Sequence, residues 1–370
     1  MFSRSNPAGA PLIVIAGGGI GGLSLALKLH AAGIHEITIV EKSRFINPEV
    51  GAGLNVLPSA MNVLSELGLL SAVTGAGVAP STQTYFTAQG LPICATARGL
   101  VLAPSGLPQV AIHRGKLHSI LYGAVVERLG KSCMLRGAKV VGYRQDEEGV
   151  TVNVVDNTTD QPLPSLHAHV LVGADGIMSA IRKQVLGRDE GLPQASGVTL
   201  YRGMVKAPKF LDGVTFCSAG TSLHKLVIYP IAEVPVDDAD GDAEPKQILN
   251  IVVEVPDISS HLEGSQPKKV DCDQVLRRLD DGPGGRFDLP FVDHRELLRQ
   301  SQNLFEWTMW DRDPIFKWVD GRVVLMGDAA HPTYPLGSCG ASMAMVDARE
   351  LVALLTKHGI QGEGGLGGPH

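Results

Sequence analysis

The sequence predicts an α/β fold in which a discontinuous, Rossmann-like dinucleotide-binding domain is interrupted by an inserted β-rich domain. Short apolar segments that end in glycine occur near residues 15, 170 and 325, as expected for strands that lead to a nucleotide. Between about residues 197 and 255 the pattern is mostly that of strands. A chain of 370 residues is long enough for two domains of ordinary size.

A βαβ unit opens the chain. The apolar, β-branched run at 12–16 predicts a buried strand, and the apolar residues from Leu23 to about Ala32 predict a helix that Gly33 ends as a C-cap. Residues 37–40 predict a second strand. Because such crossovers are right-handed, we expect the two strands to be parallel neighbours.

The later elements follow from the same periodicities. We expect helices over 111–129, 273–279, 293–299 and 337–355, and strands over 140–143, 150–155, 168–172, 198–205, 225–229, 248–255 and 322–326. The strands at 140–143 and 150–155 are expected to be antiparallel. The acidic, proline-containing stretch at 234–246 predicts a surface loop.

The first glycine cluster has the pattern Gly17-x-Gly19-x-x-Gly22 and lies between the first strand and its helix. Gly17 permits the tight turn, Gly19 lets a pyrophosphate approach the backbone, and Gly22 lets helix and strand pack closely. Glu41, 19 residues after Gly22, ends the second strand and is placed to accept hydrogen bonds from ribose hydroxyls. The alternative is a glycine-rich turn in an unrelated α/β fold, which the agreement of all these context features disfavours.

Composition excludes several other classes of protein. The net charge is −6 and no Lys/Arg-rich run occurs, so no nucleic-acid partner is expected. The five cysteines form no C-x-x-C pair, which argues against a disulfide framework and a metal site and favours a reducing, cytoplasmic location. The apolar stretch at 11–16 runs straight into glycines, so no secretory signal is expected, and no apolar run is long enough for a membrane span.

Two further motifs identify a family. The segment Gly173-Ala174-Asp175-Gly176 and the segment Gly327-Asp328-Ala329-Ala330-His331-Pro332 follow the glycine cluster in the middle and late parts of the chain. In this order they resemble the single-component FAD-dependent aromatic hydroxylases, the group A flavoprotein monooxygenases similar to p-hydroxybenzoate hydroxylase. Shared stretches such as Asp311-Arg312-Asp313-Pro314 are most similar to the phenazine hydroxylases of pyocyanin biosynthesis, followed by 3-hydroxybenzoate and salicylate hydroxylases.

The resemblance implies a reaction. FAD is the expected cofactor, NAD(P)H a transient cosubstrate, and a flavin C4a-hydroperoxide transfers a hydroxyl group from O2 to an aromatic or heteroaromatic small molecule. The sequence has no second dinucleotide fingerprint, which agrees with transient docking of NAD(P)H. Two alternatives stay open: a C-terminally truncated, catalytically silent FAD-binding protein, and a flavin oxidase or dehydrogenase. The expected oligomeric state is a monomer or homodimer.

The resemblance also implies site residues. The residues expected to bind FAD are Gly17, Gly19, Ile20, Gly22, Glu41, Lys42, Gly53, Arg114, Asp175, Asp328, Gly337, Gly340 and Ala341. No catalytic residue is assigned with certainty, but Pro335, Gly340 and Ala341 are expected to shape the flavin edge. Tyr201, Arg202 and Tyr229 are expected to contact substrate, with Arg202 meeting an anion.

Each of these roles has a structural alternative. Asp328 is expected to bind a ribityl hydroxyl but is also suited to capping a helix. Asp175 is expected near the pyrophosphate or NAD(P)H but suits a turn equally well. Arg114 is expected to bridge phosphate and flavin rather than being a solvated helix-start charge. For the three substrate residues, packing within strands is the alternative. His331 is expected to order its loop and not to act as a base.

Domain boundaries and two departures from the family complete the prediction. The FAD-binding domain is expected at 1–75, 106–190 and 312–357, the substrate domain at 76–105 and 191–311, and a disordered tail at 358–370. Cys339 stands where relatives usually carry Asn. Relatives continue with further helical segments where this chain becomes glycine-rich, which underlies the truncated alternative.

Overall fold

The structure is a computed structural model that describes residues 12–46, 51–98, 106–187, 193–222, 224–235, 244–256, 268–283 and 285–359. It divides into two compact units. The first comprises Met1–Pro48, His118–Pro193 and Asp311–His370, and the second comprises Glu49–Leu117 and Gln194–Trp310. This division assigns residues 49–75 and 106–117 to the second unit, whereas the sequence predicted that they belong to the FAD-binding domain. The reason is local: β3 (Gly53–Val56) pairs with β6 (Val110–His113), and β6 packs on β14 (Lys225–Val234).

A six-stranded sheet forms the centre of the first unit. Its order is β18-β19-β11-β1-β2-β7, and all neighbours are parallel except the edge strand β18. The strands are β1 (Ile13–Ala16), β2 (Ile37–Glu41), β7 (Met134–Arg136), β11 (Val170–Gly173), β18 (Val319–Asp320) and β19 (Val323–Leu325). Ile13 lies opposite Ile37 in the β1–β2 register, so the parallel βαβ unit predicted from the sequence is confirmed.

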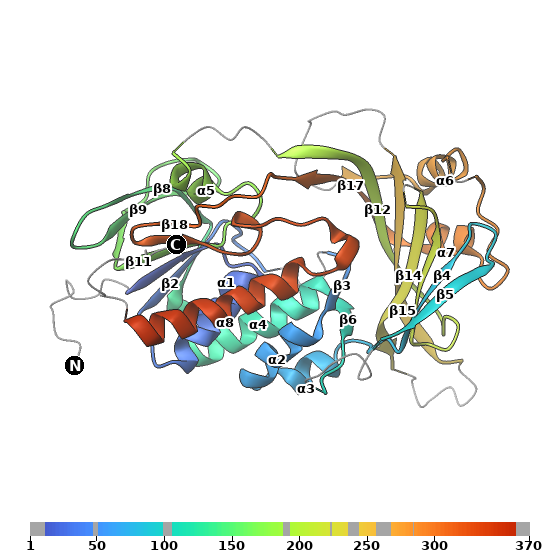
Figure 1. Cartoon of the computed structure of the whole chain (residues 1–370), viewed down its shortest axis with the longest axis horizontal. Helices are drawn as coiled ribbons and strands as arrows, with labels where there is room; N and C mark the ends of the chain where they lie inside the picture. The colour runs from blue at the N-terminus through green and yellow to red at the C-terminus, as the bar shows by residue number, and fades with distance from the viewer. Residues whose placement is uncertain are drawn as a thin grey trace. The chain divides into compact units, whose positions relative to one another are not determined.

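Two different layers cover this sheet. Val14, Val40 and Leu171 form one apolar core with residues of a three-stranded sheet, β10-β9-β8, made of β8 (Ala138–Gln145), β9 (Val150–Asp156) and β10 (Leu166–Ala168). Helix α5 (Ala180–Val185) contributes to the same core. Helix α1 (Ile20–Ala31) packs on β1 and β2 and lies beside α8 (Gly340–His358), the blue and red helices of Figure 1.

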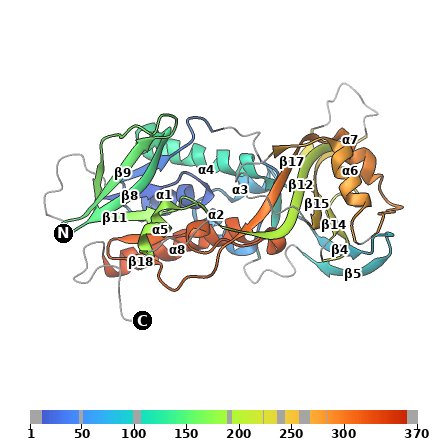
Figure 2. The ribbon, with the colours of Figure 1, turned by 90° about the horizontal axis from the view of Figure 1, so that it is seen from above.

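The second unit is built on an eight-stranded, mostly antiparallel sheet of order β16-β17-β12-β15-β14-β13-β4-β5. Its remaining strands are β4 (Thr82–Phe86), β5 (Pro92–Ala97), β12 (Gln194–Pro208), β13 (Thr215–Gly220), β15 (Lys246–Pro256), β16 (Lys268–Lys269) and β17 (Gln302–Asp311). Helices α6 (Cys272–Asp280) and α7 (His294–Gln300) pack against one face (Figure 2). Alternate residues such as Tyr201, Ile228 and Ile251 point to these helices and form the core of the unit with Leu276 and Leu298.

The remaining elements are short, apart from α4 (Arg114–Leu129). They are α2 (Pro58–Glu66), α3 (Leu70–Thr74) and the 3-10 turns Lys131–Cys133, Gly327–Ala329 and Pro335–Gly337. The predicted α/β fold with a separate β-rich domain is confirmed. Within the described residues, no helix is both long and apolar enough to cross a membrane.

Two predicted helix ranges began too early. The helix expected over 111–129, with its opening at His113-Arg114-Gly115, begins at Arg114, because residues 110–113 pair with β3. The helix expected from Gly337 begins at Gly340, because Ser338 adopts a left-handed conformation (φ 52°) that stops the preceding turn. This helix continues through His358, the first residue assigned to the tail. Residues 360–370 of that tail, and 236–243 of the expected acidic loop, lie outside the described residues.

Candidate functional site

The predicted cofactor residues of the first unit lie where its parallel strands end. Gly17 follows β1, Glu41 ends β2, Asp175 follows β11 and Asp328 follows β19. The carboxyl ends of parallel strands meet at one edge of the sheet, which is where ligands bind in folds of this kind. The fold thus brings four segments that are distant in sequence to one edge.

The three glycines of the fingerprint turn differ in what a side chain at each position would meet. A Cβ on Gly17, whose φ is +110°, would lie 2.3 Å from the carbonyl oxygen of Ala174. A Cβ on Gly22 would lie 2.0 Å from the carbonyl oxygen of Gly17. A Cβ on Gly19 would meet nothing within 4 Å. Gly17 and Gly22 therefore serve close backbone packing, and the space in front of Gly19 is open.

Helix α1 presents an uncapped N-terminus at this turn. Gly19 is its N-cap, no side chain caps it, and its first turn carries no acidic residue. Ile20, the first helical residue, is buried. The unpaired amide groups and the positive end of the helix dipole at such a terminus favour a bound anion.

Glu41 is held beside the same turn. Its Oε2 accepts a hydrogen bond from the Gly18 amide at 2.7 Å, and its Oε1 accepts one from the Ser43 amide at 2.7 Å. Each carboxylate oxygen has capacity for a further donor. His118 also contacts the turn, with Nε2 2.7 Å from the Gly18 carbonyl oxygen, and nothing in the local sequence pointed to it. Lys42 follows β2 and is exposed.

Asp175 has a turn role, which was predicted as the alternative to a role near the pyrophosphate or NAD(P)H. Its Oδ2 accepts hydrogen bonds from the amides of Ala180 at 2.9 Å and Ile181 at 3.4 Å, at the start of α5. Its Oδ1 is buried without a hydrogen-bond partner among the described residues. Burial raises the pKa of this carboxyl, although hydrogen bonds from Ser179 and the backbone oppose the shift.

Asp328 projects from a loop whose backbone is held on two sides. It is exposed, whereas Gly327, Ala329 and Ala330 are buried. Arg182 of α5, itself buried, donates from Nη1 to the carbonyl oxygen of Ala330 at 2.8 Å. The backbone of this loop is therefore held in place, and the carboxylate of Asp328 points outward.

Asp347 of α8 holds the other side of this loop. Its Oδ2 accepts a hydrogen bond from the Gly327 amide at 2.8 Å and lies 2.7 Å from His331 Nε2. The hydrogen bond to Asp347 is the main reason why the pKa of His331 is raised, and His331 also stacks on Trp318. These contacts support the interpretation that His331 orders the loop.

The start of α8 adjoins Asp328. A Cβ on Gly340 would lie 3.8 Å from Asp328 Oδ1, so the carboxylate and the helix N-terminus are neighbours. Cys339 is the N-cap but makes no capping hydrogen bond, and the first turn, which includes Ala341, has no acidic residue. Pro335 and Gly337 form the 3-10 turn that leads to this end. Like α1, α8 presents an uncapped positive end.

These features of the first unit fit FAD. The open space before Gly19 and the uncapped end of α1 suit a diphosphate. The carboxylates of Glu41 and Asp328 suit the hydroxyls of ribose and ribityl groups, and the uncapped end of α8 suits an electron-rich ring edge. Within the described residues, no three His, Cys, Asp or Glu side chains are placed to hold a metal ion.

The other predicted cofactor residues, Gly53 and Arg114, lie in the second unit. The Arg114 amide donates to the carbonyl oxygen of Ala52 at 3.0 Å. The amide of Gly53 donates to Asn250 Oδ1 at 2.7 Å, and the carbonyl oxygen of Gly53 accepts from Arg202 Nη2 at 2.6 Å. Asn250 was missed in the sequence, where an Asn within a strand carries no signal of its own.

The three predicted substrate residues do not share one face of the sheet. Arg202 and Tyr229 lie on the face away from α6 and α7, and Tyr229 stacks on Phe216 with ring centroids 4.3 Å apart. Tyr201 points the opposite way and is buried in the core beneath the helices. The structure therefore gives Tyr201 the packing role that was its alternative and keeps Arg202 and Tyr229 together.

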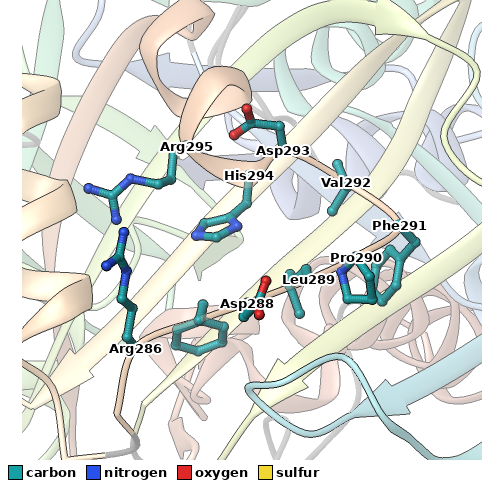
Figure 3. Close-up of a pocket in the computed structure, with 10 residues that line it drawn as sticks. Arg286, Asp288, Leu289, Pro290, Phe291, Val292, Asp293, His294 and Arg295 are labelled. Carbon is teal, nitrogen blue, oxygen red and sulfur yellow. The ribbon is translucent and has the colours of Figure 1, made fainter.

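A separate cavity of about 820 Å³ lies in the second unit and is lined by residues 286–295 (Figure 3). Arg286 and Arg295 project to the same side of His294 in this view. Arg295 is already paired with Asp280, at 2.7 Å from Nη1 to Oδ1. Burial, followed by the neighbouring Arg295, lowers the pKa of His294. None of the site residues predicted from the sequence lines this cavity.

Comparison with known proteins defines the class. A family model described as FAD binding domain matches residues 11–208 and 290–366, more than half of the chain. The chain belongs to this family, and FAD is the cofactor that its site fits. The resemblance to FAD-dependent aromatic hydroxylases is confirmed by the curated relatives.

Two of these relatives cover most of the chain. Phenazine 1,6-dicarboxylic acid hydroxylase PhzS from Lysobacter antibioticus is 37% identical over 343 residues, which are 92% of this chain and 81% of that protein. The 3-hydroxybenzoate 6-hydroxylase 1 from Aquipseudomonas alcaligenes is 31% identical, over 91% of this chain and 78% of that protein.

Solved structures share the fold. Klebsiella pneumoniae HpxO, complexed with FAD and uric acid, matches with a TM-score of 0.73 at 24% identity, covering 94% of this chain and 80% of that one. A salicylate hydroxylase substrate complex matches with a TM-score of 0.72 at 24% identity, covering 95% and 82%.

Proposed function

We propose that this protein is an FAD-dependent monooxygenase that hydroxylates an aromatic or heteroaromatic small molecule with NAD(P)H and O2. The observation that carries the proposal is the convergence, at one sheet edge of the first unit, of two uncapped helix N-termini with the carboxylates of Glu41 and Asp328. This donor and acceptor set is complementary to the diphosphate, the hydroxyls and the ring edge of FAD.

Bound FAD supplies hydride acceptance and oxygen activation, and the chain supplies binding and orientation. The amides at the start of α1, with Gly19, bind the diphosphate, and Glu41 holds the adenosine ribose. Asp328, fixed by the loop that Asp347 and Arg182 hold, accepts from a ribityl hydroxyl. The N-terminus of α8, at Gly340 and Ala341, stabilises negative charge on the ring edge. Gly53 and Arg114, which belong to the second unit, are proposed as cofactor residues from the family motifs alone.

The proposed substrate is an aromatic acid or phenol. Curated relatives are named for phenazine 1,6-dicarboxylic acid, 3-hydroxybenzoate and 6-hydroxynicotinate, and each of these names denotes a carboxylate on an aromatic ring. Arg202 and Tyr229 of the second unit are the residues proposed to meet it. NAD(P)H is proposed to dock transiently, and the five free cysteines agree with a cytoplasmic location.

The first test is the visible spectrum of the purified protein after addition of FAD and removal of unbound flavin. The proposal predicts a retained two-band flavin spectrum and NAD(P)H oxidation that aromatic acids stimulate, with a hydroxylated product. A colourless protein would instead support the catalytically silent alternative, which the hydroxylase relatives disfavour. Oxygen consumption without any hydroxylated product would support an oxidase.

A further inference from the structure

The face of the eight-stranded sheet away from α6 and α7 carries a polar cluster at its centre. Asn250 on β15 lies directly opposite Tyr229 on β14. Arg202 on β12 lies opposite Val252, two residues along β15 from Asn250 and on the same face. Phe216 on β13 stacks on Tyr229, so an aromatic surface adjoins the polar side chains.

Gly53 fixes Asn250 and Arg202 in place. Its amide donates to Asn250 Oδ1 at 2.7 Å, and its carbonyl oxygen accepts from Arg202 Nη2 at 2.6 Å. A Cβ on Gly53 would lie 2.7 Å from Asn250 Cβ, so only glycine permits this approach. Each side chain is therefore anchored through one polar atom, and the orientation of its other polar atoms is set.

Two of those atoms, one on each side chain, are unsatisfied donors. Within the described part of the chain, Arg202 Nε and Asn250 Nδ2 are both buried and have no hydrogen-bond partner. Leaving a buried donor without a partner destabilises the fold, and more so when the donor is charged. Two such donors anchored by a single residue indicate that an acceptor from outside the chain completes the cluster.

The charge of the cluster defines that acceptor. No carboxylate of the described residues pairs with Arg202, whereas Lys225 and Glu254 on the same face pair with each other at 2.9 Å. Burial raises the pKa of Tyr229, although the charge of Arg202 and a hydrogen bond with it oppose the shift, so Tyr229 gives Arg202 no counter-charge. A half-buried guanidinium without a counter-charge favours an anionic partner.

We infer that Asn250 and Arg202 together bind the anionic oxygen group of the aromatic substrate, with Asn250 Nδ2 and Arg202 Nε as donors. This inference rests on the proposed function and deepens it, because it adds Asn250 as a substrate-positioning donor beside Arg202, whose charge favours an acid over the corresponding amide. A carboxylate or a phenolate accepts both donors. A neutral carboxamide leaves the charge of Arg202 unbalanced.

The test measures binding, by calorimetry, of two matched ligand pairs to the full chain: 3-hydroxybenzoate against 3-hydroxybenzamide, and phenazine-1-carboxylate against phenazine-1-carboxamide. Wild type is expected to bind the acid of at least one pair about tenfold or more tightly than its amide. Asn250→Asp keeps an acceptor for the Gly53 amide but replaces the Nδ2 donor by a negative oxygen. This variant is expected to lose the preference for the acid, and Arg202→Lys to reduce it.

Ser218→Ala, on the same face of β13, is the matched control and is expected to keep the wild-type preference. The inference is overturned if wild type binds acid and amide equally, or if it binds none of the ligands tested. An Asn250→Asp variant that unfolds at the wild-type temperature and keeps the preference also overturns it. Because calorimetry does not depend on turnover, a protein that prefers acids but hydroxylates none contradicts the proposed function and leaves this inference standing.

Discussion

At the scale of single residues, two glycines of one motif have different constraints. A Cβ on Gly22 would lie 2.0 Å from a backbone oxygen, whereas one on Gly19 would meet nothing within 4 Å. Gly22→Ala is expected to lower the free energy of unfolding by about 2–4 kcal/mol. Gly19→Ala is expected to change it by less than about 1 kcal/mol and to weaken FAD binding about tenfold or more. Thermal unfolding and FAD titration measure the two effects, and wild-type FAD affinity in Gly19→Ala would contradict the role of Gly19.

The contact between His331 and Asp347 predicts a pH dependence. The pKa of His331 is raised in the folded protein, so its protonated form stabilises the fold fully below its unfolded value of about 6.5. That contribution is lost as the pH rises through the higher, folded value. Asp347→Asn keeps a polar partner but removes the charge, and should flatten the fall in unfolding free energy above about pH 6.5. Urea unfolding at several pH values tests this, and parallel pH profiles of variant and wild type would show that the pair does not titrate as described.

At the scale of elements, the sequence predicted structure well where the residues involved are close together in the chain. It did not predict contacts between residues that are far apart in the chain. The β1–α1–β2 unit is confirmed because strand, glycine turn, helix and strand follow one another within 30 residues, from Leu12 to Glu41. The hydrogen bond between Gly53 and Asn250 joins residues 197 apart, and neither residue type signals the other. The contact between His331 and Asp347 depends on where α8 packs. The side-chain directions of Tyr201 and Arg202 became clear only from the strand register.

At the N-terminus of α8, the effect of a capping side chain on helix stability can be separated from the effect of its charge on FAD binding. Cys339 makes no capping hydrogen bond there. Cys339→Asn and Cys339→Asp both introduce a good N-cap and are expected to stabilise the helix by about 0.5–1 kcal/mol. Only Asp adds a negative charge at the end proposed to face the ring edge, so only Asp should weaken FAD binding. Thermal unfolding and FAD titration are the measurements, and equal FAD affinities of the two variants would argue against a cofactor at this helix end.

At the scale of the whole molecule, three separate stretches of chain build the cofactor unit. Gly19, Asp175 and Asp328 come from its first, second and third stretches. A ligand that binds only the folded form stabilises it, by about 2.7 kcal/mol at a hundredfold excess over Kd. FAD should therefore raise the unfolding temperature in a concentration-dependent way, and Gly19→Ala should shift this response to higher FAD concentrations. An unfolding temperature that FAD leaves unchanged would contradict this prediction.

The FAD site is proposed to serve hydroxylation of an aromatic ring. The most direct measurement is turnover of the FAD-loaded protein with NAD(P)H, isotopically labelled dioxygen and a panel of phenazine and hydroxybenzoic acids, with mass spectrometry of the products. A monooxygenase is expected to give a product that carries one labelled oxygen atom on its ring. Labelled hydrogen peroxide as the sole oxygen product, with every acid recovered unchanged, would contradict it.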